Sequence, residues 1–187
     1  NLEIFVFREG HLKASSVIFD IKSMNSFVHL TNYSVQKYNQ EFSKHEIGNE
    51  ISFNSFQEYL DKSNINVNFK QEIYPKLLNL IEISMRSISH LINMNNRDNC
   101  FELFGYDFIL DDKFNAYILE VNTNPGLEDS SPLITMLIPR MLDDMFKLTI
   151  DEIFKPSQIL MNSQSNIING ILDKNNPVSA QNSKRQV

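Results

Sequence analysis

The chain has 187 residues and a formal net charge of −6, which argues against non-specific binding to nucleic acid or acidic membranes, because lysine and arginine drive such binding. Its length allows a hydrophobic core without disulfides or structural metals. A single cysteine, Cys100, excludes an internal disulfide and a zinc–cysteine cluster, and we expect it to be a buried or half-buried thiol without a role.

No apolar run reaches the length of a membrane span, and the first residues show no basic segment followed by an apolar one. We therefore expect a cytosolic protein that has neither a membrane nor a nucleic acid as its partner. The chain starts at Asn1 instead of methionine and passes at once into strand-like sequence. This start suggests a piece of a longer protein.

The N-terminal sequence predicts a β-hairpin. Two strand-like runs, LEIFVF and HLKASSVIF, flank Glu9 and Gly10, and a glycine at this place can take the positive φ of a tight turn. Residues 25–54 are polar and rich in asparagine and serine, without sustained periodicity. They predict a long loop with at most a short helix, and long loops often carry function.

Two helices are predicted next. The sequence SFNSFQEYLDKS predicts a short helix that is capped by Ser52 or Asn54. Residues 68–95 show apolar residues at helical spacing, with Pro75 near the start, where its missing N–H is tolerated. We expect this long helix to cover a sheet.

The C-terminal part of the chain predicts one further helix and a tail. PLITMLIPRMLDDMFKLTIDEIF predicts a helix that begins at Pro132 and is kinked at Pro139. Residues 156–187 are rich in asparagine, serine and glutamine and predict a polar linker or disordered tail. Residues 1–155 are therefore expected to form the folded domain.

A second hairpin, FELFGYDFILDDKFNAYILEVNTNPG, carries a carboxylate in each strand where an apolar residue is expected, Asp107 and Glu120. If the chain turns through residues 112–115, these two carboxylates lie opposite each other across the ladder. Asn122, two residues beyond Glu120, lies on the same face because side chains alternate along a strand.

Two facing carboxylates destabilise a hairpin unless a proton or a cation lies between them. Oxygen ligands at this density suit Mg²⁺, which keeps several waters and completes its shell with substrate phosphates. The alternative is an ordinary amphipathic hairpin in which Asp107 and Glu120 point to solvent. The spacing leaves both interpretations open.

Four motifs occur in a fixed order: FREGHLK from Phe7, HLTNYSVQK from His29, GNEISFNSFQEYLD from Gly48, and FELFGYDFILDD with YILEVNTNPGLE from Phe101. Together they resemble the tubulin–tyrosine ligase-like family of ATP-grasp amino-acid ligases, over residues 2–154. The resemblance implies an α+β fold, the C-terminal subdomain of an ATP-grasp domain, incomplete without the upstream half. In this interpretation both hairpins form one antiparallel sheet packed against helices.

The resemblance implies two cofactors, ATP and Mg²⁺, and places the metal at the second hairpin. Asp107, Glu120 and Asn122 match the family's Mg²⁺ ligands, which also bind the nucleotide through the metal. The ions would bridge the phosphates and neutralise charge as the phosphoryl group moves to the acceptor carboxylate.

Three further residues match positions near the reacting groups. Thr31 and Asn32 match residues beside the phosphates and the acyl-phosphate, where Asn32 is expected to be catalytic. Lys13 stands where the family usually has arginine, as a second catalytic residue facing the substrate carboxylate or transferred phosphate; it offers a point charge instead of a bidentate fork. Without the family, Thr31 and Asn32 would be a helix cap, Lys13 a solvated surface charge and His29 a structural histidine.

The function that the resemblance implies is ligation of an amino acid to a carboxylate of tubulin through an acyl-phosphate. Glutamate is the preferred donor, as in a polyglutamylase, because HLTNYS resembles glutamylating members more than glycylating or tyrosinating ones. The partners would be acidic tubulin tails and a free amino acid, at microtubules, cilia or flagella. The chain alone is expected to be inactive. The alternative is a noncatalytic, truncated ligase half that acts as a binding module; a ligase for a small-molecule substrate is disfavoured.

Overall fold

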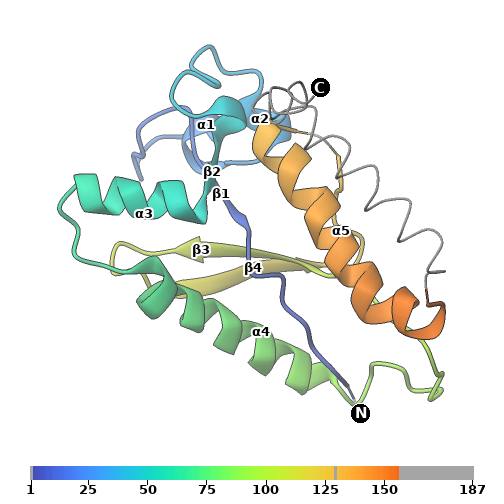
Figure 1. The fold of residues 1–187 in the computed structure, drawn as a ribbon. Helices are drawn as coiled ribbons and strands as arrows, with labels where there is room; N and C mark the ends of the chain where they lie inside the picture. The colour runs from blue at the N-terminus through green and yellow to red at the C-terminus, as the bar shows by residue number, and fades with distance from the viewer. Residues whose placement is uncertain (1, 129, 156–187) are drawn as a thin grey trace, which may run out of the picture. The chain divides into compact units, whose positions relative to one another are not determined.

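A computed structural model describes residues 2–128 and 130–155 (Figure 1). The chain divides into two compact units, Asn1–Asp143 and Asp144–Val187, and the boundary lies inside the last helix. The predicted polar tail at residues 156–187 lies outside the described residues. No helix in the described part of the chain is long and apolar enough to cross a membrane.

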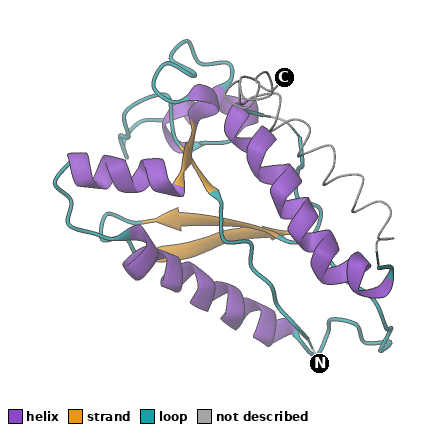
Figure 2. Ribbon diagram, viewed as in Figure 1, coloured by secondary structure: helices purple, strands orange, loops and turns teal. Residues whose placement is uncertain are grey.

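The described elements mix helices with antiparallel strands (Figure 2), as the sequence predicts. In chain order they are β1 (His11–Lys13), α1 (Ser26–His29), α2 (Tyr33–Gln36), the 3-10 helix η1 (Ile47–Asn49), β2 (Glu50–Ser52), α3 (Phe53–Lys62), the π-helix η2 (Phe69–Ile73), α4 (Tyr74–Ile88), β3 (Gly105–Leu110), β4 (Ala116–Asn122) and α5 (Pro132–Ile153). The strands form two separate two-stranded antiparallel sheets, β1–β2 and β3–β4. The prediction of one sheet made from two hairpins is therefore wrong.

The predicted N-terminal hairpin does not form. Within residues 2–24 the only strand is β1, which pairs with β2 so that Leu12 lies opposite Ile51. Gly10 does not take the positive φ that the predicted tight turn requires. Among the glycines in the described residues, Gly48 alone has a positive φ. Gly10 instead leaves room for the ring of Phe53, whose Cζ lies 2.7 Å from where a Cβ would stand. Sequence alternation indicated a strand here but not its partner.

The polar segment 25–54 is more structured than predicted, because it contains two short α-helices, the 3-10 helix η1 and β2. Gln36, whose side chain is fully buried, accepts a hydrogen bond from the Ser16 N–H and donates two, to the carbonyls of Phe27 and Leu30. One glutamine thus supplies the internal partners that backbone groups of an irregular segment need.

The two helices predicted after residue 51 are present. Ser52 caps α3, since its hydroxyl accepts a hydrogen bond from the Ser55 N–H at 3.0 Å. The long helix begins as η2 and continues as α4, with Pro75 in its first turn. It ends earlier than predicted, at Ile88, and turns follow at residues 89–95, where Asn93 takes a positive φ.

The core lies where α3, η2 and α4 meet. Leu60 and Ile73 are 1 % and 0 % exposed, and the rings of Phe53 and Phe69 lie 4.4 Å apart between their centroids. Helix α4 runs beside β3–β4 (Figure 1) and contacts it through a 2.8 Å hydrogen bond between the hydroxyl groups of Ser84 and Tyr106. The expectation that the long helix covers a sheet is confirmed.

The C-terminal helix α5 begins at Pro132 and includes Pro139, as predicted. The kink expected at Pro139 stays a prediction. Cys100 is exposed, so the expectation of a buried or half-buried thiol is wrong. It follows the asparagine-rich, exposed residues 93–99, which lie beyond the end of α4.

Candidate metal-binding and catalytic site

Asp107 in β3 and Glu120 in β4 lie directly opposite each other, as predicted. The pairing near the turn differs by one residue from the prediction, because Leu110 and not Asp111 lies opposite Ala116. A β-bulge then places an extra residue, Leu119, in β4 and brings Glu120 opposite Asp107. Bulges of this kind redirect a side chain, and this one pairs the two acidic residues across the ladder.

Asn122 contacts one of these two carboxylates, and Lys13 contacts the other. The Asn122 amide donates a hydrogen bond from Nδ2 to Glu120 Oε1 at 3.2 Å. Lys13 reaches from β1, and its Nζ lies 3.9 Å from Asp107 Oδ1. Four residues predicted from the sequence thus meet beside the hairpin, and we call Lys13, Asp107, Glu120 and Asn122 the hairpin cluster.

The donor atoms of the hairpin cluster fit Mg²⁺. Two carboxylates and an amide oxygen are hard ligands, and Mg²⁺ is often held by one or two carboxylates while water and phosphate oxygens complete its shell. Asp107 is 42 % exposed at its side chain and Glu120 is exposed, which leaves room for those other ligands. Within residues 2–128 and 130–155, no group of three or more His, Cys, Asp or Glu side chains is arranged to hold a metal by itself.

Lys13 changes the electrostatics of this cluster. Its ammonium group, 34 % exposed, offsets part of the repulsion between two carboxylates. A cation in the same place favours an anionic group, such as a phosphate or a carboxylate, beside Asp107. The cluster therefore combines oxygen ligands for a metal with one basic group for an anion.

Thr31 and Asn32 are placed differently. Thr31 is half-buried, and Asn32 is the N-cap residue of α2, where its carbonyl accepts from the Gln36 N–H at 2.9 Å. The Asn32 side chain makes no capping hydrogen bond, so helix capping does not account for an asparagine side chain at this position. No hydrogen bond or ion pair in the described part of the chain joins either residue to the hairpin cluster, and their roles stay predictions.

Sequence analysis missed a second polar group, centred on Glu50 at the start of β2. Glu50 accepts hydrogen bonds from the hydroxyls of Ser130 and Ser131, and His11 Nε2 lies 3.9 Å from its Oε1. Burial holds the pKa of His11 below its usual value, against the opposing effect of Glu50, so His11 is neutral at pH 7. The available signal was a charged residue in the strand-like sequence EIS, the same signal that identified Asp107.

One minor expectation is also resolved, and one further ion pair is present. His29 is the structural histidine expected from its sequence context, because its Nε2 lies 2.7 Å from the Ser23 carbonyl oxygen. Arg140 in α5 forms an ion pair with Glu9 at 2.7 Å. Neither contact involves the hairpin cluster.

Comparison with known proteins settles the family. The model of the Tubulin-tyrosine ligase family matches residues 1–160. The chain belongs to the tubulin–tyrosine ligase family. This confirms the resemblance that the four motifs carry, and the motifs include all six residues predicted for the site.

Family members similar to this chain have names that describe different amino-acid donors. Tubulin glycylase 3D of Tetrahymena thermophila is 34 % identical over 155 residues, which are 80 % of this chain and 15 % of that protein. The human Protein monoglycylase TTLL8 is 29 % identical over 80 % of this chain and 18 % of its own length. The human Tubulin monoglutamylase TTLL4 is 32 % identical over 79 % of this chain and 13 % of its own length. The chain thus spans less than a fifth of each relative.

Proposed function

We propose that this chain is the C-terminal subdomain of an ATP-grasp ligase that joins an amino acid to a carboxylate of tubulin. The observation that carries the proposal is the hairpin cluster, in which Asp107 faces Glu120 beside Lys13. The oxygen ligands suit a hard cation, and the ammonium group beside them suits an anion. Mg²⁺ would be that cation, and a phosphate of ATP or the acceptor carboxylate would be that anion.

In this proposal the residues of the hairpin cluster, and Thr31 and Asn32, have different roles. Asp107, Glu120 and Asn122 would hold Mg²⁺, which supplies charge neutralisation for the phosphates of ATP. Lys13 would orient the acceptor carboxylate or the transferred phosphoryl group by its positive charge. Thr31 and Asn32 would donate neutral hydrogen bonds to the phosphates and to the acyl-phosphate, and Asn32 is the second catalytic residue.

The proposed reaction has two balanced steps. A carboxylate oxygen of the acceptor attacks the γ-phosphorus of ATP, and the bond to the β–γ bridging oxygen breaks, giving an acyl-phosphate and ADP. The donor's amino group then attacks the acyl carbon, and inorganic phosphate leaves while the amine loses a proton. The phosphate released carries one oxygen of the original carboxylate.

The acceptor and the donor are proposed from different observations. Tubulin is proposed as acceptor because the relatives' names contain it, and the protein would act at microtubules, including those of cilia or flagella. For the donor, the HLTNYS motif favours glutamate, whereas two of the three relatives described above are named for glycine. The test below therefore uses glycine and glutamate as alternative donors. A net charge of −6 disfavours acidic tails, so a basic surface must come from elsewhere in the protein or from local lysines such as Lys13.

A heavy-oxygen transfer experiment tests the mechanism. Tubulin peptides that carry heavy oxygen in their glutamate side-chain carboxylates are incubated with the full-length protein, ATP, Mg²⁺ and either glycine or glutamate. We expect one heavy oxygen in each inorganic phosphate released, together with a peptide that gains one residue of the accepted donor. Mass spectrometry measures both products.

The noncatalytic binding module makes the opposite prediction. It would bind tubulin peptide without consuming ATP and release no labelled phosphate. Peptide extension with unlabelled phosphate would reject the acyl-phosphate but keep the ligase. These outcomes separate the reaction from its mechanism.

A further inference from the structure

Glu50 is a buried carboxylate that the proposed chemistry does not use. Its side chain is 4 % exposed. Its Oε1 accepts a hydrogen bond from the Ser130 hydroxyl at 3.0 Å, and its Oε2 accepts one from the Ser131 hydroxyl. A carboxylate removed from water needs such donors, and hydrogen bonds to a charged acceptor are stronger than neutral ones. The contact therefore fixes the serines firmly.

The contact links β2, the ladder partner of β1, to the residues that follow β4 and precede α5. Glu50 in β2 is the ladder partner of Lys13 in β1. Ser131 closes the segment that leaves β4 after Asn122, and it starts α5, because its Oγ accepts from the Ile134 N–H at 3.3 Å. Glu50 thus links the strand of the lysine to the segment that follows the amide ligand.

The same segment is held by two close approaches at glycines. A Cβ on Gly48, whose φ is +72°, would stand 2.9 Å from Ser131 Cβ. A Cβ on Gly105 would stand 2.9 Å from Pro125 Cβ. Only glycine allows so close an approach, so Pro125 packs against the first residue of β3 and Ser131 packs against η1.

These contacts form a closed circuit between two sheets that share no ladder. The circuit runs from Lys13 to Asp107 by charge, from Asp107 to Glu120 by pairing, and from Glu120 to Asn122 by a hydrogen bond. It then follows the chain to Ser131, passes to Glu50 and returns to Lys13. Glu50 is its buried side-chain link.

We propose that Glu50 is a positioning residue, a latch which holds Ser130 and Ser131 at the start of α5 and so sets the distance between Lys13 and the proposed ligand Asn122. The inference rests on the proposed function of the hairpin cluster. Glu50 touches no reacting group in this account. It acts by holding the two sides of the cluster in register.

Hydrogen exchange in the full-length protein tests the latch directly. In Glu50→Gln, a neutral amide replaces the charged acceptor, and we expect exchange of the Ile134 and Thr135 amides to accelerate about tenfold, while peptides from β3–β4 stay unchanged. Ser130→Ala, a milder variant that leaves the α5 cap intact, should shift exchange in the same direction. The matched control is Glu58→Gln on the exposed face of α3, which should change neither. Unchanged exchange in both latch variants overturns the proposal.

Metal binding tests whether the latch positions the cluster. Mn²⁺ is titrated in the presence of a non-hydrolysable ATP analogue, and free Mn²⁺ is followed by electron paramagnetic resonance. We expect about tenfold weaker binding in Glu50→Gln and an unchanged affinity in Glu58→Gln. Faster exchange with unchanged Mn²⁺ affinity would make Glu50 purely structural and overturn the positioning role. If the unmodified protein itself binds no Mn²⁺, the proposed metal site fails, and hydrogen exchange alone decides the latch.

Discussion

Asp107 and Glu120 repel each other, and the fold brings them together all the same. Both side chains are in contact with solvent, so the repulsion is small, of the order of 0.2–1 kcal/mol for like charges directly opposite in a ladder. Lys13, with its Nζ 3.9 Å from Asp107, offsets part of it. A site that binds a cation would use this arrangement, because the ion relieves the repulsion.

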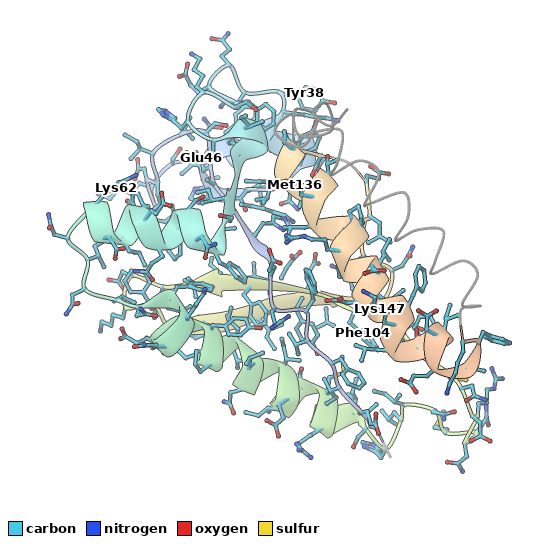
Figure 3. The ribbon with its side chains drawn as sticks, in the orientation of Figure 1. Tyr38, Glu46, Lys62, Phe104, Met136 and Lys147 are labelled. Atoms are coloured by element: carbon cyan, nitrogen blue, oxygen red, sulfur yellow. The ribbon has the colours of Figure 1, made fainter. Side chains whose placement is uncertain are left out.

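Replacing Glu120 by glutamine tests that interpretation through stability. Without metal, we expect Glu120→Gln to leave the free energy of unfolding unchanged or raise it by up to about 0.5 kcal/mol, since one of two facing charges is lost. Thermal unfolding in a chelator measures this. Glu58→Gln, which removes a carboxylate paired with Lys62 (labelled in Figure 3), is the control. A loss above about 1 kcal/mol in Glu120→Gln alone would mean that the carboxylate has a structural role.

Lys13 provides a second test at the same scale. If its charge orients an anion, Lys13→Met should lower the rate of amino-acid incorporation by at least about tenfold, whereas Lys13→Arg keeps the charge and should retain most of the rate. Initial rates at saturating ATP measure both variants. Equal rates in Lys13→Met and the unmodified protein would show that Lys13 is a surface charge.

The β3–β4 hairpin sets the geometry of the site at the scale of elements. Its turn is held by Asp111, which accepts hydrogen bonds from the backbone N–H groups of Lys113 and Asn115 at 2.9 and 2.7 Å. Phe114 takes a φ of +56°, and its carbonyl oxygen accepts from Lys76 of α4 at 2.8 Å. Turn and bulge together decide which residue faces Asp107.

The stability that this turn contributes depends on pH, because Asp111 is a titratable group. Hydrogen bonds, above all from the Asn115 side chain, lower the pKa of Asp111 below its usual value. The folded state therefore binds fewer protons than the unfolded state, and the stabilisation is present above the usual pKa and lost as pH falls through the lowered one. We expect the melting temperature of Asp111→Asn to fall less steeply below about pH 4 than that of the unmodified protein.

Thermal unfolding between about pH 6 and pH 3 measures this difference. Asp112→Asn removes the same charge one residue further along and is the matched control. Parallel curves for Asp111→Asn and the unmodified protein would contradict the role of Asp111 in the turn.

Local signals in the sequence predicted some elements and missed others for physical reasons. The Ser52 cap and Pro75 mark helix starts, because each acts on its own first turn. The partner of β1 was missed because pairing between residues 11 and 52 is set by packing that no short window contains. Glu50 was missed for the same reason, since its partner Ser131 is 81 residues away.

In the candidate site, the motifs indicated which residues to expect, but the sequence did not indicate the register that brings them together. Asp107 and Glu120 were predicted to pair, but a regular ladder from the observed turn would place Leu119 opposite Asp107. The bulge that moves Glu120 opposite Asp107 cannot be recognised from the alternation of apolar residues in the sequence. Lys13 was expected at the site from the resemblance alone, and its contact with Asp107 became visible only in the fold.

At the scale of the whole molecule, membership in the tubulin–tyrosine ligase family and the hairpin cluster point to one activity. The relatives are much longer than this chain, which makes up 15 % of Tubulin glycylase 3D. The test of the activity therefore belongs to the full-length protein. In the described residues the two sheets share no ladder, so the Lys13–Asp107 contact is what connects Lys13 of β1 to the β3–β4 hairpin.

The most direct measurement is incorporation of labelled glycine or glutamate into tubulin by the full-length protein, with Glu120→Gln and Glu58→Gln measured beside it across a range of Mg²⁺ concentrations. We predict ATP- and Mg²⁺-dependent incorporation by the unmodified protein and by Glu58→Gln, and its loss, by at least about a hundredfold, in Glu120→Gln. Equal incorporation by folded Glu120→Gln at every Mg²⁺ concentration would contradict the metal assignment. No incorporation by any of the three proteins would contradict the ligase itself.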